Sequence, residues 1–168
     1  VGSYLQQRHG GMRVAILDID FHHGNGTQEI FYSDPGVLYA SLHADPDGEY
    51  PFHWGGADER GDGAGLGANL NVPLPAGTDD ARYLEALDDT LASIHEYAPI
   101  FLIVSAGFDI GVGDPSVLTG DFKISPEGFG AIGRRVRALD LPTVIVQEGG
   151  YRLETLAANA TAFLSAFK

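Results

Sequence analysis

The sequence predicts one α/β domain built as three layers, with helices on both faces of a mostly parallel β-sheet. Short apolar runs rich in Val, Ile and Leu recur along the chain, and they lack the strict alternation of strands that face water on one side. Segments with helical periodicity lie between these runs, as they do in βαβ units. With 168 residues, 44% of them hydrophobic, the chain is long enough to bury one substantial core.

Four apolar runs are predicted to be buried strands, and a fifth run is a weaker candidate. The four are residues 14–19, 37–42, 100–106 and 143–147. The weaker candidate, 69–74, is predicted as an edge strand that ends at Pro73 and Pro75, because proline has no N–H to donate to a central ladder.

Three helices are predicted between and after these strands. The first spans 79–97, behind the cap candidate Thr78, and its leucines and isoleucine recur at spacings of three and four. The second begins with Ser125 as N-cap and Pro126 at the first helical position, and it runs to about residue 139. The third spans about 153–167.

Two segments depart from this regular pattern. Residues 43–67 are Gly-rich and without periodicity, far longer than the common loop of about 2–6 residues, and the aromatics within them favour an ordered, functional loop. Residues 4–11 resemble the last turns of a helix with its glycine stop. We therefore expect the chain to begin inside an element and to be the C-terminal part of a longer catalytic domain.

Composition excludes several kinds of site. Because the chain has no Cys, a metal must be held by nitrogen and oxygen. Twenty-three acidic residues against ten basic ones argue against nucleic-acid binding, and an acidic surface attracts cationic ligands or simply maintains solubility. No apolar run approaches the ~20 residues that span a bilayer, and the start does not resemble a signal peptide. The expected location is the cytoplasm, without membrane contact.

The clearest cluster of chemical groups follows the first predicted strand. Side chains of a strand alternate between its faces, so Asp18, Asp20 and His22 are expected on one face, with Ile19 and Phe21 on the other. Burying unpaired carboxylates is costly, and a metal ion would offset that cost. The alternative is an N-capping Asp beside a hydrogen-bonded core histidine at a strand-to-helix turn.

Two further candidates follow later strands. Asp109 comes just after the strand 100–106, and Tyr151 follows the strand 143–147 through a Gly-Gly turn. Taken alone, Asp109 would be a loop residue bonding its own backbone, and Tyr151 a packing residue. Open α/β sheets, however, bind ligands beyond the carboxyl ends of their strands. Two carboxylates and one imidazole there predict a three-ligand metal site, with a hydroxyl donor beside it.

Three motifs together resemble the histone deacetylase superfamily. They are residues 18–28 (Asp-Ile-Asp-Phe-His-His-Gly-Asn-Gly-Thr-Gln), 105–109 (Ser-Ala-Gly-Phe-Asp) with Gly-Asp-Pro at 113–115, and 148–151 (Glu-Gly-Gly-Tyr). Within that superfamily, Tyr-Pro-Phe at 50–52 and the Gly-rich run 55–65 are most similar to bacterial acetylpolyamine amidohydrolases. The resemblance implies the arginase-like α/β fold and hydrolysis of N-acetyl groups from acetylpolyamines, acetyl-lysine or another cationic amine.

The resemblance also implies roles for individual residues. Asp20, His22 and Asp109 match the zinc ligands, although iron or cobalt suits the same donors. Tyr151 matches the phenol that polarises the acetyl carbonyl. Asp18 and Ser41 match side-chain ligands of a structural potassium ion, so that Asp18 orients the centre rather than binding the catalytic metal.

One feature of that superfamily has no match in this sequence. The general base of the resembled enzymes comes from a tandem His pair upstream of the first strand, and His22-His23 is not that pair because His22 is used by the metal. The chain is thus expected to supply the metal and oxyanion half of the site. Two alternatives stay open, a binuclear metallohydrolase of the ureohydrolase type and a metal-stabilised binding domain without catalysis. A homo-oligomer is left open as well.

Overall fold

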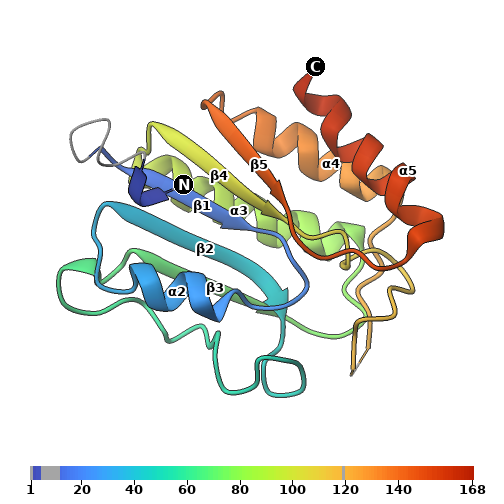
Figure 1. Cartoon of the computed structure of the whole chain (residues 1–168), viewed down its shortest axis with the longest axis horizontal. Coiled ribbons are helices and arrows are strands. Elements are labelled where there is room, and N and C mark those ends of the chain that lie inside the picture. The colour runs from blue at the N-terminus through green and yellow to red at the C-terminus, as the bar shows by residue number, and fades with distance from the viewer. Residues whose placement is uncertain (1, 5–11, 119) are drawn as a thin grey trace.

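The computed structural model describes residues 2–4, 12–118 and 120–168, and its centre is a five-stranded sheet (Figure 1). The strand order is β3-β2-β1-β4-β5, and all four pairings are parallel. The strands are β1 (Val14–Asp18), β2 (Val37–Ala44), β3 (Asn69–Leu74), β4 (Phe101–Ala106) and β5 (Thr143–Gln147). The predicted α/β class with a parallel sheet is confirmed.

The strand order determines where a site can form. The chain leaves the central strand β1 toward β2 and β3 on one side, and it returns to build β4 and β5 on the other. β1 and β4 therefore meet where the order reverses, and crevices at such points bind ligands in open α/β sheets. Asp18 at the end of β1 is in register with Ser105 of β4 and Ser41 of β2.

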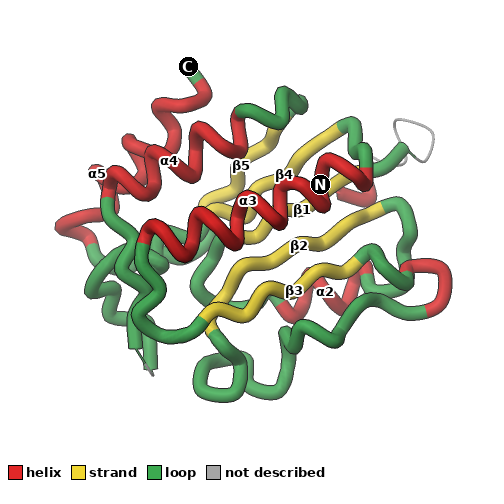
Figure 2. Tube along the Cα trace, turned by 180° about the vertical axis from the view of Figure 1, so that it is seen from behind, coloured by secondary structure: helices red, strands yellow, loops and turns green. Residues whose placement is uncertain are grey.

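Helices cover both faces of the sheet, as predicted. The face seen in Figure 1 carries α2 (Asn25–Phe31), and the opposite face, seen in Figure 2, carries α3 (Asp80–Tyr97) and α4 (Pro126–Arg137). α5 (Leu153–Leu164) packs against α4, and short 3₁₀ helices span Gly63–Gly65 and Ser165–Phe167. The larger core lies between the sheet and α3, α4 and α5, because each of these helices presents one apolar face to it.

Some predicted boundaries are wrong, for local reasons. Asp79, rather than Thr78, caps α3 by accepting the N–H of Arg82, while the hydroxyl of Thr78 donates to the carbonyl of Pro75 instead. The sequence reasoning missed α2, whose buried side chain is Gln28, so that it lacks an apolar periodic stripe. Ser125 and Pro126 begin α4 as predicted. The predicted helix end at 4–11 lies largely outside the described residues.

The long loop after β2 is held in place by a partly buried polar network, whereas its aromatic residues are exposed. The Glu59 carboxylate accepts the N–H of Gly55 at 3.0 Å and a side-chain hydrogen bond from Gln28 at 2.5 Å. Asn69 of β3 donates to the Glu59 carbonyl at 2.7 Å. These bonds hold the loop against α2 and the sheet, and Tyr50 of the same loop lines the pocket described below.

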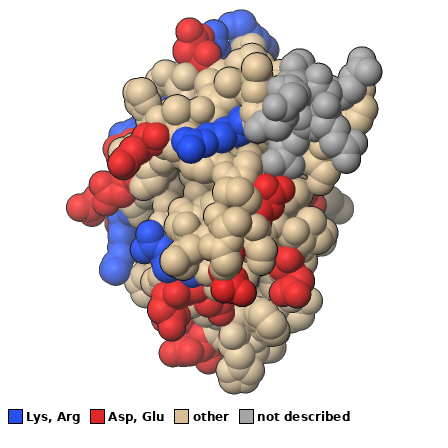
Figure 3. All heavy atoms as spheres, turned by 90° about the vertical axis from the view of Figure 1, so that its left-hand side faces the viewer, with Lys and Arg blue, Asp and Glu red and all other residues tan. Residues whose placement is uncertain are grey.

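The acidic composition is visible on the surface. Acidic side chains are spread over the face shown in Figure 3, with a few basic ones between them. In the described part of the chain, no helix combines the length and apolar character that crossing a membrane would need.

Candidate metal centre

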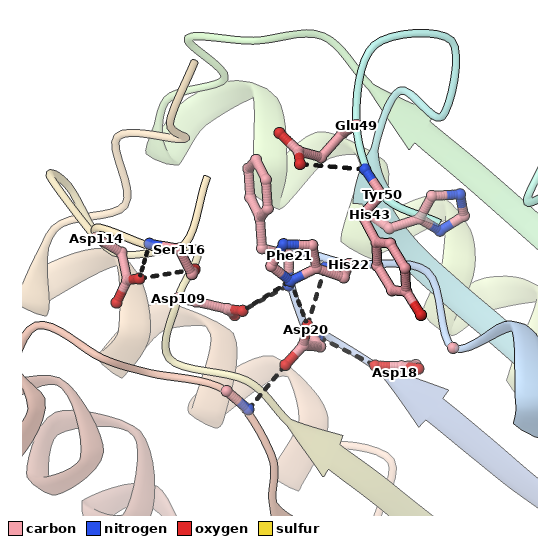
Figure 4. A network of polar contacts seen from close by, with 12 residues as sticks. Asp18, Asp20, Phe21, His22, His43, Glu49, Tyr50, Asp109, Asp114 and Ser116 are labelled. Atoms are coloured by element: carbon pink, nitrogen blue, oxygen red, sulfur yellow. Dashed lines mark hydrogen bonds and ion pairs between the residues drawn. The ribbon is translucent and has the colours of Figure 1, made fainter. Parts of the chain in front are cut away.

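The structure brings Asp20, His22 and Asp109 together at the carboxyl ends of β1 and β4 (Figure 4). The Nδ1 atom of His22 lies 3.3 Å from Oδ1 of Asp20 and 3.2 Å from Oδ2 of Asp109. One ligand atom from each residue lies within 4.8 Å of the others. Residues 87 or more positions apart in sequence are thus neighbours, because β1 and β4 are adjacent strands.

The alternation predicted from the sequence continues past the end of β1. Ile19 and Phe21 are fully buried in the larger core, whereas Asp20 and His22 line a pocket on the other side of the backbone. The backbone N–H of Phe21 donates to Oδ1 of Asp109 at 3.0 Å, which holds that carboxylate beside the first strand. Burial of Ile19 and Phe21 in the core therefore directs Asp20 and His22 toward the pocket.

Two glycines let the backbone pass close to the carboxylates. A Cβ at Gly149 would overlap the carboxylate oxygens of Asp109 and Asp20, and a Cβ at Gly107 would overlap Asp20. The Gly149 N–H instead donates to Oδ2 of Asp20 at 2.9 Å. Any larger residue would displace the two carboxylates, so the packing of the centre requires glycine at positions 107 and 149.

The charges of this cluster depend on one another. Burial lowers the pKa of His22, but hydrogen bonds to Asp109 and Asp20 outweigh it and raise that pKa to about 10. Burial alone would raise the pKa of Asp20, yet hydrogen bonds from His22 and the Gly149 N–H bring it below its usual range. Burial raises the pKa of Asp109. These shifts favour the charged forms of His22 and Asp20 in the metal-free fold and disfavour the charged form of Asp109.

This donor set fits a divalent metal ion. Two carboxylates and one imidazole are a common three-ligand set for zinc and similar ions, and such sites leave a position open for substrate. The acidic pair lies in a site where an unneutralised charge would be costly. The positive charge that balances this pair comes either from the protonated imidazole of His22 or from a metal ion that replaces its proton.

Asp18 and Ser41 lie beside this cluster in a more enclosed position. Burial is the main cause that raises the pKa of Asp18, to about 7. Its carboxylate accepts hydrogen bonds from the Tyr39 hydroxyl at 2.8 Å and from the Asp20 N–H at 3.1 Å. Ser41, also buried, shares a hydrogen bond of 2.8 Å with Nδ1 of His43. The two residues are in register on neighbouring strands, as expected if both served one cation.

Tyr151 lines the same pocket as the cluster. This pocket has a volume of about 580 Å³, and its walls include Asp20, His22, Tyr50, Glu148 and Tyr151. Burial and the charges of Asp109 and Asp20 raise the pKa of Tyr151 above its ordinary value of 10. A phenol is already protonated at neutral pH, so Tyr151 can donate a hydrogen bond there. Its side chain is 58% exposed.

Sequence reasoning missed several residues that shape the site. Tyr50 lies against His22, with ring centroids 6.2 Å apart, and the sequence marked it only as part of the Tyr-Pro-Phe run, without a role in the site. His23 is buried, hydrogen-bonded to Gln28 at 3.1 Å and packed on His43. The two adjacent histidines therefore have different surroundings. His22 lies with Asp20 and Asp109, whereas His23 is buried beside Gln28 and His43.

Comparisons with known proteins agree with this geometry. The sequence profile of the histone deacetylase domain matches residues 2–167. An acetylpolyamine amidohydrolase of Burkholderia pseudomallei (strain 1710b) is 48% identical over 163 residues, which are 97% of this chain and 46% of that protein. Acetylpolyamine amidohydrolase 1 of Pseudomonas aeruginosa is 45% identical over 166 residues, or 99% of this chain and 46% of that relative.

The fold is similar to a solved structure as well. The crystal structure of an acetylpolyamine aminohydrolase from Burkholderia pseudomallei superposes with a TM-score of 0.93 at 48% identity, covering 99% of this chain and 47% of that one. The chain spans about half the length of the curated relatives it matches. The arginase-like and deacetylase-like fold expected from the motifs is thus confirmed.

Proposed function

The chain belongs to the histone deacetylase domain family, and from this premise we propose that it carries the metal and oxyanion half of a zinc-dependent deacetylase site. Its relatives support the hydrolysis of acetylated amines as the reaction. The observation that carries the proposal is the convergence of Asp20, His22 and Asp109 in a pocket that Tyr151 also lines. We propose that residues 1–168 are the C-terminal part of one catalytic domain.

Each residue has a distinct part in this mechanism. Asp20, His22 and Asp109 would hold the ion, and Zn²⁺ suits the donors, as do Fe²⁺ and Co²⁺. When bound, such an ion supplies Lewis acidity for an acetyl carbonyl and for water. The Gly149 N–H orients Asp20, and the Phe21 N–H orients Asp109, so both carboxylates are fixed before substrate enters.

Tyr151 would stabilise the charge that develops on the carbonyl oxygen. Its phenol donates a hydrogen bond most strongly when the carbonyl becomes an oxyanion, which makes it a transition-state contact. The phenol carries this proton at neutral pH because the ordinary pKa of tyrosine is about 10. As the resemblance to the histone deacetylase superfamily implies, proton transfer to the leaving amine is assigned to a tandem His pair outside residues 1–168, while His22 and His23 contact Asp109 and Gln28.

A structural potassium ion is proposed at Asp18 and Ser41. Asp18 is a buried carboxylate whose hydrogen bonds come from a phenol and a backbone amide, so a nearby monovalent cation would stabilise its charge. These contacts also favour one divalent ion over two, because Asp18 is already engaged by Tyr39 and the Asp20 N–H. A binuclear ureohydrolase-type centre would need a further bridging carboxylate.

The proposed substrate is a cationic acetylated amine, and we propose a cytoplasmic enzyme that binds neither nucleic acid nor membrane. The excess of acidic residues supports attraction of a cation, with a formal net charge of -13. The exposed rings of Tyr50, Phe52 and Trp54 lie on the loop beside the pocket and suit the apolar part of such a substrate.

Activity assays on two forms of the protein test this proposal. The intact gene product, loaded with zinc, should release acetate from acetylpolyamines or acetyl-lysine peptides, and removal of the metal by a chelator should abolish turnover. The 168-residue chain should bind zinc with little or no turnover, because the proposed base lies outside it. A zinc-loaded intact protein that hydrolyses neither substrate class would refute the proposal, and full activity of the short chain would refute the half-site assignment.

A further inference from the structure

The orientation of Tyr151 depends on its backbone. Its side chain is 58% exposed, and within the described part of the chain its hydroxyl has no hydrogen-bond partner. A phenol that must meet a carbonyl oxygen at hydrogen-bond distance therefore needs its main chain held by other groups. Two attachments in the structure do this, one on each side of the positive-φ residue Gly150.

The first attachment is to the metal cluster. The Gly149 N–H donates to Oδ2 of Asp20 at 2.9 Å, and the Gly149 carbonyl accepts the N–H of Phe108 at 2.9 Å. This pair of bonds places the start of the turn against the strand end that leads to Asp109. It does not by itself determine the direction of the residues that follow Gly150, because glycine has a wide range of φ and ψ.

The second attachment is to Asp114, a residue that the proposed mechanism does not otherwise use. Its side chain is 4% exposed. Oδ2 accepts the backbone N–H groups of Tyr151 at 2.8 Å and Arg152 at 3.1 Å. Oδ1 accepts the N–H of Ser116 at 3.0 Å and its hydroxyl at 2.8 Å (Figure 4). One buried carboxylate thus collects four donors, two of them from the tyrosine turn.

Neighbouring contacts reinforce the same connection. Arg152 passes over Gly113, where a Cβ would overlap its guanidinium, and its Nη1 donates to the carbonyl of Val112 at 2.7 Å. The segment that begins with Asp109 and includes Asp114 is therefore joined to the Tyr151 turn by main chain and by side chain. Asp109, a proposed metal ligand, and Tyr151 therefore belong to two segments that are bonded directly to each other.

We propose that Asp114 is the positioning residue for Tyr151, acting by holding the backbone of residues 151 and 152 so that the phenol points to the metal centre. This inference rests on the proposed function of Tyr151. Hydrogen bonds to a carboxylate are stronger than neutral ones, so the turn is held tightly. Displacement of a catalytic group by about 1 Å can cost about 100-fold in rate.

The kinetic test uses Asp114→Asn in the zinc-loaded intact gene product. Asparagine keeps the shape of the side chain but offers one carbonyl oxygen to four donors. We expect kcat to fall by about 10-fold or more, with KM changed less than about threefold and zinc content unchanged. Asp121→Asn is the matched control, because Oδ2 of Asp121 accepts the Gly113 N–H at 2.8 Å in the same region without contacting the turn.

A double-mutant cycle separates positioning from general destabilisation. If Asp114 acts through the phenol, adding Asp114→Asn to Tyr151→Phe should lower kcat by less than about threefold, because the hydroxyl that it positions is already absent. An equal loss of kcat in both backgrounds would overturn the inference, and so would a kcat of Asp114→Asn equal to that of wild type.

Amide hydrogen exchange on the zinc-loaded 168-residue chain gives a readout independent of turnover. Exchange at Tyr151 and Arg152 should speed up by about 10-fold or more in Asp114→Asn, and further in Asp114→Ala, while Asp121→Asn leaves it unchanged. An inactive wild-type enzyme would refute the proposed function. The exchange data would then still show whether Asp114 holds the backbone of Tyr151 and Arg152. Unchanged protection of both amides in both Asp114 variants would overturn the positioning role.

Discussion

The backbone N–H of Gly149 donates a hydrogen bond of 2.9 Å to Oδ2 of Asp20, and so joins the turn after the last strand to a carboxylate after the first. The two residues are 129 positions apart in sequence. Because the same turn continues into Tyr151, the cluster of Asp20, His22 and Asp109 is connected directly to the phenol. The proposed metal ligands and the proposed hydrogen-bond donor are therefore oriented together.

The first prediction concerns metal content. Asp109→Ala should strongly lower the zinc bound by the folded chain, whereas His23→Ala should retain most of it, because His23 bonds to Gln28 rather than to the cluster. Elemental analysis of both purified variants, with wild type at about one ion per chain, measures this. Equal zinc in the two variants would show that the cluster is not the metal site.

The second prediction concerns protons. The pKa of His22 is raised from 6.5 to about 10 in the metal-free fold, so its stabilising ion pair is complete below pH 6.5 and is lost as the pH rises through about 10. Zinc must displace this proton. Below pH 10, binding should therefore release about one proton per ion and tighten by about tenfold per pH unit.

Calorimetric titrations in two buffers of different ionisation enthalpy measure this proton release. A matched series at pH 7, 8 and 9 gives the slope of the affinity. If zinc affinity does not vary across that range, then His22 does not carry the proton that the metal displaces.

The third prediction concerns the phenol. Tyr151→Phe in the zinc-loaded intact enzyme keeps the ring and removes only the hydroxyl, so zinc content and the free energy of unfolding should change little. Loss of one oxyanion donor typically lowers kcat by about 10²–10³, or roughly 2.7–4 kcal/mol. Steady-state kinetics test this. A kcat within about threefold of wild type would assign Tyr151 to packing alone.

The fourth prediction concerns acid stability. Burial, with a smaller effect of the nearby His23, lowers the pKa of His43 to about 3. The unfolded chain takes up the proton near pH 6.5 and the folded chain does not, so His43 makes stability fall as the pH drops from 6.5 toward 3. Its contribution to the slope should approach about 1.4 kcal/mol per pH unit.

Urea unfolding at pH 4.5, 5.5 and 6.5 measures that slope. His43→Gln should be less stable than wild type at pH 6.5, yet lose stability less steeply on acidification. His95→Gln removes an exposed imidazole and serves as the control. An identical slope in wild type and His43→Gln would contradict the assignment of this acid sensitivity to His43.

The sequence by itself determined the local features of this protein. The apolar runs of β1, β2 and β4 were recognisable because strands covered on both faces need such runs. The run of β5 was recognised as well, but the prediction that it is buried is wrong, because β5 lies at the edge of the sheet and exposes Val144 and Val146. The alternation of polar and apolar residues from Asp18 to His22 was likewise sufficient to place Ile19 and Phe21 in the core. Ser125 and Pro126 identified the start of α4, since capping depends on neighbouring residues.

Only the tertiary structure decided how these local features combine. The formation of α2 around a buried Gln28 depended on contacts with other segments, because the Gln28 side chain is hydrogen-bonded to Glu59, Asn69 and Asn71. The sequence marked Asp114 only as part of the Gly-Asp-Pro motif and gave it no role, because its partners at Tyr151 and Arg152 come from the end of another strand. Periodicity and capping act over a few residues, whereas strand order determines which distant donors a buried carboxylate meets.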